Sequence, residues 1–242
     1  MIDIHCHMLP GLDDGPKTLT EALQMAEFAR DQGISRVMLT PHIQPGCYDN
    51  NQDSIQHAYR QFKTALQQHG IALQVGMAAE IRVCAELPQM IMQNQIPFLG
   101  NWQDKKVILL EFPHETVPIG AEQLVKWLLA RDILPMIAHP ERNQGLLRHP
   151  EKLAPFVKLG CLLQVTASSI TGLFGNACQQ YALRLIQANW VTAIASDAHN
   201  MHKRLPTFAG VTECLEPLIG QSVCQQLLHD NPLRLIQNHP QC

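Results

Sequence analysis

Met1-Ile-Asp-Ile-His5-Cys-His7 opens the chain and predicts a β-strand that carries two histidines at positions i and i+2. Because successive side chains of a strand point to opposite faces, His5 and His7 project together while Cys6 points the other way. Two imidazoles on one face of a strand can bind one metal ion. A histidine pair near a chain terminus can also simply be solvated, so the metal interpretation depends on finding further ligands.

Beyond this strand, short apolar strands alternate with helices along the whole chain. The capping-box pattern Thr18-x-x-Glu21 predicts the start of the first helix, and Gly33 predicts its end. We expect the other strands at residues 35–40, 71–78, 106–110, 133–138, 161–166 and 190–195, and the other helices at 49–69, 85–93, 120–131, 150–159, 176–189 and from 207 onward. Seven such strands predict an α/β fold with a parallel sheet that is buried on both faces. Since no linker or repeat interrupts the pattern, we expect one domain spanning residues 1–242.

Metal-ligand residue types lie at or just after the carboxyl ends of six of these seven strands. In a (β/α) barrel these strand ends form a single rim, which is where active sites lie. Only the strand at 161–166 offers no obvious ligand. The candidates, in chain order, are His5, His7, His42, Glu80, Glu111, His139, Asp197 and His199.

The ligand types indicate which ions the rim would bind. Imidazoles and carboxylates without thiolates favour Mn²⁺, Fe or Zn²⁺ over a structural zinc site. With Asp14 included, the set is larger than one ion needs and indicates two or three ions. Such clusters activate water and neutralise charge on a phosphoryl group. Arg142 and Arg204 follow ligand positions and could grip phosphate oxygens, although surface salt bridges are the ordinary alternative for each.

Composition excludes several other classes of function. The chain is 46% hydrophobic and 16% charged with a net charge of −3, which argues against disorder and against nucleic acid as a partner. No apolar run reaches the roughly 18 residues of a membrane span. The chain enters a strand directly, without a targeting segment, so we expect a cytoplasmic location. The eight scattered cysteines are expected to be free and mostly buried thiols.

A thiol-based chemistry is an alternative to the metal site, because Cys178 and Arg184 have the C-x5-R spacing of thiol-based tyrosine phosphatases. That mechanism needs a backbone-amide cradle for phosphate and a thiol with a depressed pKa. The residues between Cys178 and Arg184 contain no glycine and continue a predicted helix. We therefore expect Cys178 to pack in the interior and Arg184 to be solvated.

Taken together, the motifs resemble those of the PHP (polymerase and histidinol phosphatase) superfamily, and within it the bacterial protein-tyrosine phosphatases encoded with capsule and exopolysaccharide genes. The match runs nearly end to end. The residues that carry it are Met1-Ile-Asp-Ile-His-Cys-His-Met-Leu-Pro-Gly-Leu-Asp-Asp-Gly15, Thr40-Pro-His42, Glu80, Leu110-Glu111, Ala138-His-Pro-Glu-Arg142 and Ala195-Ser-Asp-Ala-His-Asn200.

The resemblance implies a distorted seven-stranded (β/α)7 TIM-like barrel with three metal ions, usually manganese, at the carboxyl ends of the strands. It also implies that Arg142 and Arg204 bind the phosphate, and His42 could assist the leaving group. Asp14 is taken as the ligand because it directly precedes a glycine, which leaves Asp13 in a turn or supporting role. The implied ligand sets are His5, His7, Glu80 and Asp197 for one ion, Glu80, Glu111 and His139 for a second, and Asp14, His42 and His199 for a third.

The implied activity is that of a metal-dependent protein-tyrosine phosphatase. Its substrate would be the phosphotyrosine tail of a cognate bacterial tyrosine autokinase, hydrolysed by in-line attack of a metal-bound hydroxide, with capsule or exopolysaccharide synthesis as the regulated process. Two alternatives stay open: a small-molecule phosphomonoesterase of the histidinol-phosphatase type, and a non-catalytic, metal-stabilised module that binds the kinase tail. The loop after His42 lacks a second histidine that many relatives carry, and Tyr48 in this loop could stack on an incoming aromatic ring or be an ordinary loop residue.

Overall fold

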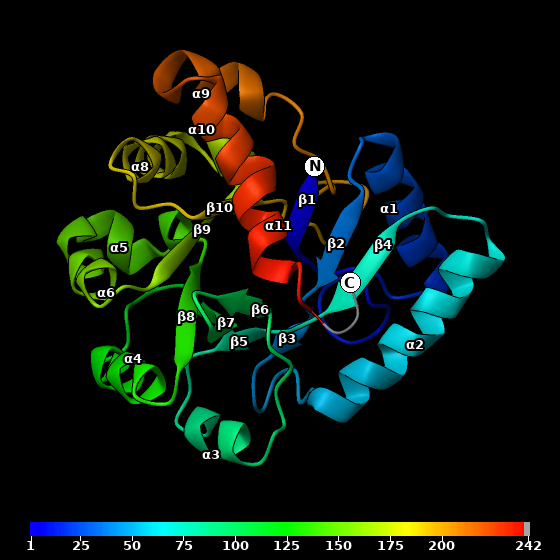
Figure 1. The fold of residues 1–242 in the computed structure, drawn as a ribbon, viewed down its shortest axis with the longest axis horizontal. Helices are drawn as coiled ribbons and strands as arrows, with labels where there is room; N and C mark the ends of the chain where they lie inside the picture. The colour runs from blue at the N-terminus through cyan, green and yellow to red at the C-terminus, as the bar shows by residue number, and fades with distance from the viewer. Residues whose placement is uncertain (240–242) are drawn as a thin grey trace.

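Parallel strands occupy the middle of the molecule and helices surround them (Figure 1). The computed structural model describes residues 1–239 of the 242-residue chain. The strands are β1 (Ile2–Cys6), β2 (Arg36–Leu39), β3 (His42–Ile43), β4 (Gln74–Met77), β5 (Glu80–Arg82), β6 (Gly100–Trp102), β7 (Lys105–Glu111), β8 (Ile133–Ala138), β9 (Leu162–Thr166) and β10 (Ala193–Ala195). The α-helices are α1 (Leu19–Asp31), α2 (Gln52–Gln68), α3 (Leu87–Met92), α4 (Ala121–Leu129), α5 (Gln144–Arg148), α6 (Ala154–Lys158), α7 (Ala167–Ile170), α8 (Asn176–Gln187), α9 (Val211–Ile219), α10 (Gln221–Gln225) and α11 (Asn231–Ile236). Two 3₁₀ segments, η1 (Pro140–Arg142) and η2 (Pro150–Leu153), and a π-helical turn, η3 (Gln226–Asp230), complete the described chain.

The strands are assigned to two sheets, with the orders β1-β2-β4 and β10-β9-β8-β7-β5-β3. All pairs in them are parallel except the pairing of β6 with β7. The predicted α/β fold with a parallel sheet is therefore confirmed. Within residues 1–239 the assigned pairs leave both sheets open and do not by themselves form a closed ring.

Backbone hydrogen bonds continue between the two sheets. The chain passes from β2 to β3 across Thr40-Pro41 and from β4 to β5 across Ala78-Ala79. The pairing of β2 with β4 continues into that of β3 with β5 through the bonds from Ala78 N to Leu39 O (2.8 Å) and from Glu80 N to Pro41 O (3.1 Å). At the other edge, Asp197 N donates to His5 O over 2.9 Å, just beyond β10. These bonds bring the ends of β1, β3, β5 and β10 to one region of the molecule.

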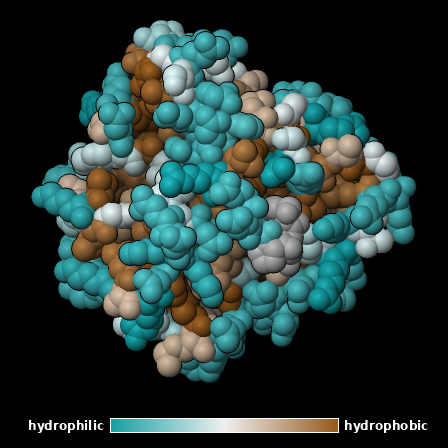
Figure 2. Space-filling view, in the orientation of Figure 1, coloured by the Kyte–Doolittle hydropathy of each residue, from teal (hydrophilic) through white to brown (hydrophobic). Residues whose placement is uncertain are grey.

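The apolar interior has two parts. Leu235 and Ile236 of α11 join Ile2 and Ile4 of β1 in a cluster among the strands, and α11 lies in front of the strands in Figure 1. A larger cluster fills the space between the sheets and the other helices. Gly100 allows α11 to approach closely, because a Cβ at this position would lie 2.2 Å from Leu235 O. The face shown in Figure 2 is largely hydrophilic, with smaller hydrophobic areas between the helices.

Most predicted elements are present, and several strands are shorter than expected, whereas β8 has the predicted bounds and β7 is longer. The Thr18 side chain caps α1 in the predicted capping box with Glu21. The strand predicted at 190–195 is reduced to β10, and the strand expected at 71–78 begins only at Gln74. The short antiparallel β6 was not predicted, because its three residues show no apolar alternation. The predicted helical remainder after residue 207 is present as α9, α10, η3 and α11.

No helix within residues 1–239 combines the length and the hydropathy required to cross a bilayer. The seven cysteines in this part of the chain are free thiols, of which Cys6, Cys161, Cys178 and Cys224 are buried, and Cys242 lies outside the described residues.

Candidate metal centre and its arginines

Eight of the nine candidate ligands form three overlapping groups. Within each group, the ligand atoms lie within 4.8 Å of one another. The ninth, His139, contacts the groups through Glu80, because its Nε2 lies 2.7 Å from Glu80 Oε1. The groups are His5, His7, Glu80 and Asp197; His7, Asp14, His42 and His199; and His42, Glu80 and Glu111. Residues separated by up to 194 positions thus converge at one place.

The first group is fully buried. His5 Nε2 lies 3.3 Å from both Glu80 Oε2 and Asp197 Oδ1, and His7 Nε2 lies 3.3 Å and 3.4 Å from the same two atoms. All four side chains have 0% solvent exposure. Two imidazole nitrogens and two carboxylate oxygens therefore enclose a common centre, as the ligands of a metal ion do.

Three histidines are oriented by bonds to their outer ring nitrogens. His5 Nδ1 lies 2.9 Å from Gln164 Oε1, His7 Nδ1 lies 2.7 Å from Asp13 Oδ2, and His199 Nδ1 lies 3.0 Å from the backbone oxygen two residues before it. Each of these acceptors fixes the proton on Nδ1 and leaves the Nε2 lone pair facing the cluster. The supporting role expected for Asp13 agrees with this geometry.

Gln164 was missed by the sequence analysis, which found no obvious ligand after the strand at 161–166. Its side chain is fully buried in β9 and bonds to His5. A glutamine inside an otherwise apolar strand is a usable signal, because a buried polar side chain requires a partner.

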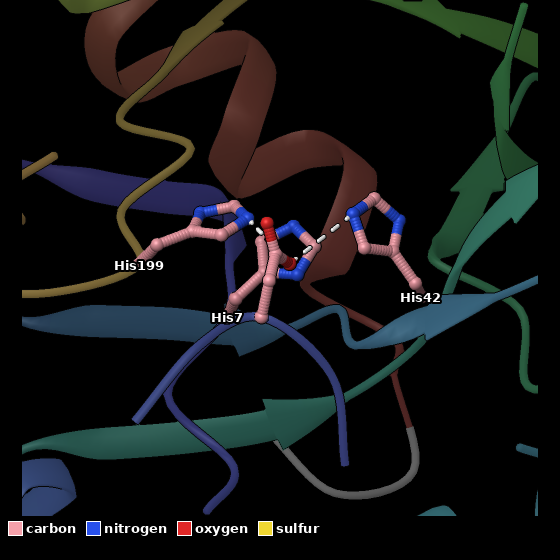
Figure 3. Close-up of side chains that lie close together, drawn as sticks. His7, His42 and His199 are labelled. Atoms are coloured by element: carbon pink, nitrogen blue, oxygen red, sulfur yellow. Dashed lines mark ion pairs between the residues drawn. The ribbon is translucent and has the colours of Figure 1, made fainter. Parts of the chain in front are cut away.

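The second group lies at the more open side of the centre. Asp14 Oδ1 is 3.2 Å from His199 Nε2 and 3.6 Å from His42 Nε2. Figure 3 shows the rings of His199 and His42 on opposite sides of His7, facing the same point. Burial would raise the pKa of Asp14, but the close contact with His199 Nε2 and the neighbouring imidazoles lower this pKa to about 2, so the group is a carboxylate.

The third group concentrates negative charge. His42 Nδ1 lies 3.0 Å from Glu80 Oε2 and 3.8 Å from Glu111 Oε2, and Arg82 Nε lies 2.8 Å from the same Glu111 oxygen. Burial and the nearby Glu80 raise the pKa of Glu111 to about 7. A cation between Glu80 and Glu111 would remove the repulsion that contributes to this shift. The group contains His42 where the resemblance had implied His139.

Buried atoms without regular hydrogen bonds show that the centre fits metal ions. Within residues 1–239, five buried atoms that face the groups make no hydrogen bond of regular geometry: His42 Nδ1, Glu80 Oε2, Glu111 Oε2, Asp197 Oδ1 and His199 Nε2. Their near neighbours are other ligand atoms of the groups and, for Glu111, the Arg82 guanidinium. Buried polar atoms that lack a well-formed hydrogen bond are costly and uncommon, and coordination of cations by the three groups would satisfy these five. Burial lowers the pKa of His139 and of His199 to about 4, aided by Arg142 and His7 respectively, so both imidazoles are neutral, as metal ligands must be.

Two candidate ligand residues adopt left-handed backbone conformations. His139 has φ 30° and Asp197 has φ 52°. Such conformations are uncommon for residues other than glycine and persist only where the surrounding structure holds them. They are found most often at functional sites. Here they turn the chain directly after β8 and just after β10.

The two arginines meet at the same carboxylate. Arg142 Nη1 and Arg204 Nη2 both donate to Asp197 Oδ2, from η1 and from the loop after β10. Arg204 Nη1 also lies 3.9 Å from Asp14 Oδ2. The guanidinium groups therefore border the metal-ligand groups, where they could bind an oxyanion.

The thiol interpretation does not agree with the structure. Cys178 lies inside α8, where burial raises the pKa of its thiol, whereas a nucleophilic cysteine needs a lowered pKa. Arg184 is exposed on the same helix.

Comparisons with known proteins identify the family. A family model described as capsular polysaccharide synthesis, CpsB/CapC, matches residues 1–237. The tyrosine-protein phosphatase YwqE of Bacillus subtilis (strain 168) is 40% identical over 204 residues, which cover 84% of this chain and 79% of that protein. The tyrosine-protein phosphatase CpsB of Streptococcus agalactiae serotype V is 29% identical over 244 residues, which cover 99% of each chain.

Comparison with solved structures supports the same family. A chain from the crystal structures of YwqE from Bacillus subtilis and CpsB from Streptococcus pneumoniae, described as unique metal-dependent tyrosine phosphatases, superposes with a TM-score of 0.91 at 36% identity, covering 98% of this chain and 95% of that one. The phosphotriesterase homology protein of Escherichia coli has a TM-score of 0.58 at 12% identity, covering 98% of both chains, and shares the fold alone. The resemblance seen in the sequence motifs is thereby confirmed. The chain belongs to the CpsB/CapC family of capsular polysaccharide synthesis.

Proposed function

We propose that this protein is a metal-dependent protein-tyrosine phosphatase that acts in capsule or exopolysaccharide synthesis. The main support for the proposal is the composition of the candidate metal centre. Imidazoles and carboxylates, all buried except Asp14, form overlapping ligand groups, several of their atoms make no regular hydrogen bond within residues 1–239, and two arginines border the same groups. The relatives named as tyrosine-protein phosphatases add the substrate class.

We propose three ligand sets, which the proximity of the ligand atoms supports. His5, His7, Glu80 and Asp197 would hold one ion; Glu80 and Glu111, with His139 or His42, a second; and Asp14, His42 and His199 a third. Imidazole and carboxylate ligands are consistent with two or three Mn²⁺ ions, with Fe or Zn²⁺ as alternatives. Bound ions would supply a lowered pKa for coordinated water and would neutralise charge on phosphoryl oxygens.

The protein's own residues would bind and orient the substrate. Arg142 and Arg204 reach the centre from two different loops, so together they can donate to two non-bridging phosphate oxygens. We propose that His42 assists departure of the leaving group; its position at the more open side, with its ring stacked on that of the partly exposed Tyr48, supports this role. A tyrosyl leaving group, with a pKa of about 10, needs less protonation than an alkoxide.

We further propose that the chain forms one domain, a distorted seven-stranded barrel in which β2 continues into β3 and β4 into β5. The hydrogen bonds from Asp197 N to His5 O (2.9 Å) and from His7 N to Ala198 O (2.8 Å) support closure between β10 and β1. The ligand groups would then lie at the carboxyl-end rim of the barrel. The free buried thiols are consistent with a reducing compartment, and we propose that this is the cytoplasm.

The proposed substrate is the phosphotyrosine tail of a bacterial tyrosine autokinase. A small-molecule phosphomonoesterase of the histidinol-phosphatase type would use the same metal groups, and a non-catalytic module would use them only to bind the tail. The test is hydrolysis by the Mn²⁺-loaded protein of a phosphotyrosyl peptide and of histidinol phosphate. We expect a higher kcat/KM for the peptide. Preference for histidinol phosphate would favour the first alternative, and no hydrolysis of either compound would favour the second.

A further inference from the structure

We propose that Phe174 is a positioning residue that holds Arg142 in the orientation needed to bind phosphate. The guanidinium carbon of Arg142 lies 4.4 Å from the centre of the Phe174 ring. Nothing in the sequence motifs marks this phenylalanine, which is 32 residues from Arg142 in the chain. The inference rests on the proposed function, because it assigns Arg142 to the phosphate.

Phe174 is held in place from the side of α7. It belongs to the loop Thr171–Gly175, in which Leu173 N donates to Ser168 O over 2.9 Å and Gly175 N donates to Gly172 O over 3.0 Å. Both Gly172 (φ 87°) and Gly175 (φ 90°) have positive φ, a conformation that glycine adopts at little cost. The loop therefore has a defined turn that directs Phe174 back over η1.

Arg142 is connected to α7 by hydrogen bonds of the preceding residue, Glu141. Glu141 is fully buried, and its Oε1 accepts hydrogen bonds from Thr166 N over 2.8 Å and from Ser169 Oγ over 2.7 Å. The segment that carries Arg142 and the segment that carries Phe174 are thus joined at one short helix. Their relative position is set by this connection as well as by the ring contact.

The contact has a specific physical effect on Arg142. A cation over an aromatic face is attracted by the ring, more strongly where water is excluded. Because the ring covers one face of the planar guanidinium, the N–H groups along its edge are left for Asp197 and for an oxyanion. The ring also limits the other orientations of a long, flexible side chain, so less conformational entropy is lost when phosphate binds.

The test measures binding of inorganic phosphate to the Mn²⁺-loaded protein by isothermal titration calorimetry, separately from hydrolysis. We expect Phe174→Leu to weaken phosphate binding about 5- to 30-fold, which corresponds to the loss of about 1–2 kcal/mol of cation–π attraction. Phe174→Tyr keeps the aromatic face and should bind phosphate like the wild type. Leu173→Ala, at an exposed neighbour in the same loop, is the matched control and should leave binding unchanged.

A double-mutant cycle separates positioning from a general loss of structure. In an Arg142→Lys background, which lacks the planar guanidinium, Phe174→Leu should cause little further weakening. Equal phosphate affinity of Phe174→Leu and wild type would overturn the proposal, as would an undiminished effect in the Lys background, or loss of bound Mn²⁺ in Phe174→Leu. If the wild type binds phosphate with this dependence but hydrolyses no phosphotyrosyl peptide, the proposed function fails and the positioning role stands.

Discussion

Asp13→Asn should weaken metal binding although Asp13 is not a proposed ligand. Asp13 Oδ2 accepts from His7 Nδ1 over 2.7 Å and from His42 N over 2.9 Å, and its Oδ1 accepts from Gly15 N over 2.9 Å. An asparagine keeps the shape but turns one acceptor into a donor, so in either orientation its amide nitrogen faces an N–H group. If it faces His7, the His7 proton must move to Nε2, and the lone pair directed at Glu80 and Asp197 is lost.

The expected magnitude follows from the role of Asp13 in orienting one ring and one loop. Removal of such a partner of a metal-ligating histidine typically costs 10- to 100-fold in metal affinity, or about 1.4–2.8 kcal/mol. Burial would raise the pKa of Asp13, but the charge and hydrogen bond of His7 lower it well below its usual range. The carboxylate of Asp13 is therefore charged at neutral pH, and both variants are titrated in the same buffer at one pH, because protons compete with the metal for the histidine ligands.

The assay is calorimetric titration of chelator-stripped protein with Mn²⁺. Asp31→Asn is the matched control, because Asp31 is exposed and pairs only with the adjacent Arg30 among the ion pairs found in residues 1–239. We expect the Mn²⁺ affinity of Asp13→Asn to fall 10- to 100-fold below that of the control. Equal affinities of the two variants would refute the orienting role of Asp13.

Further predictions concern the ligand support, the core and the thiols. Gln164→Leu removes the acceptor of His5 Nδ1 and should lower Mn²⁺ affinity about tenfold in the same titration; unchanged affinity would show that Gln164 does not orient His5. Phe156→Ala empties a fully buried site beside Phe112 and should lower the free energy of unfolding by about 3–5 kcal/mol in urea denaturation; a loss under about 1 kcal/mol would contradict the packing. Burial raises the pKa of Cys161 to about 12, so its thiol stays protonated at pH 8, and mass spectrometry should find iodoacetamide on the exposed Cys47 and not on Cys161 of the folded protein; rapid labelling of Cys161 would contradict its burial.

The sequence was informative about the site because of two regular features of parallel α/β folds. Side chains alternate along a strand, which put His5 and His7 on one face, and parallel strands end at one edge, which brought Glu80, Glu111 and Asp197 toward them. Both features depend only on spacing and strand direction. They therefore predicted which residues would gather, and the structure brings all of these together.

The sequence could not predict how the gathered residues contact each other. That His42 faces Glu80 and Glu111 with Nδ1 while its Nε2 faces Asp14 depends on side-chain rotation, which spacing does not set. The bond between Gln164 and His5 joins residues 159 positions apart. Such contacts arise from the packing of distant segments, for which a local pattern carries no signal.

The exact ends of the strands could not be predicted from the sequence either. The second strand was predicted to end at residue 40, but pairing resumes at His42 and Ile43 through β5, whose partner residues lie 38 positions farther along the chain. The strand predicted at 71–78 is likewise interrupted before Glu80. Register with a neighbouring strand decides these details, and register is a property of the assembled sheet.

The most direct test of the metal centre is anomalous diffraction from crystals grown with Mn²⁺, recorded on both sides of the manganese absorption edge. We expect strong anomalous peaks enclosed by His5, His7, Glu80 and Asp197, with further peaks beside Glu111 and beside Asp14. A map with no peak among these residues, or with manganese bound only elsewhere on the protein, would contradict the proposal that they form a metal centre.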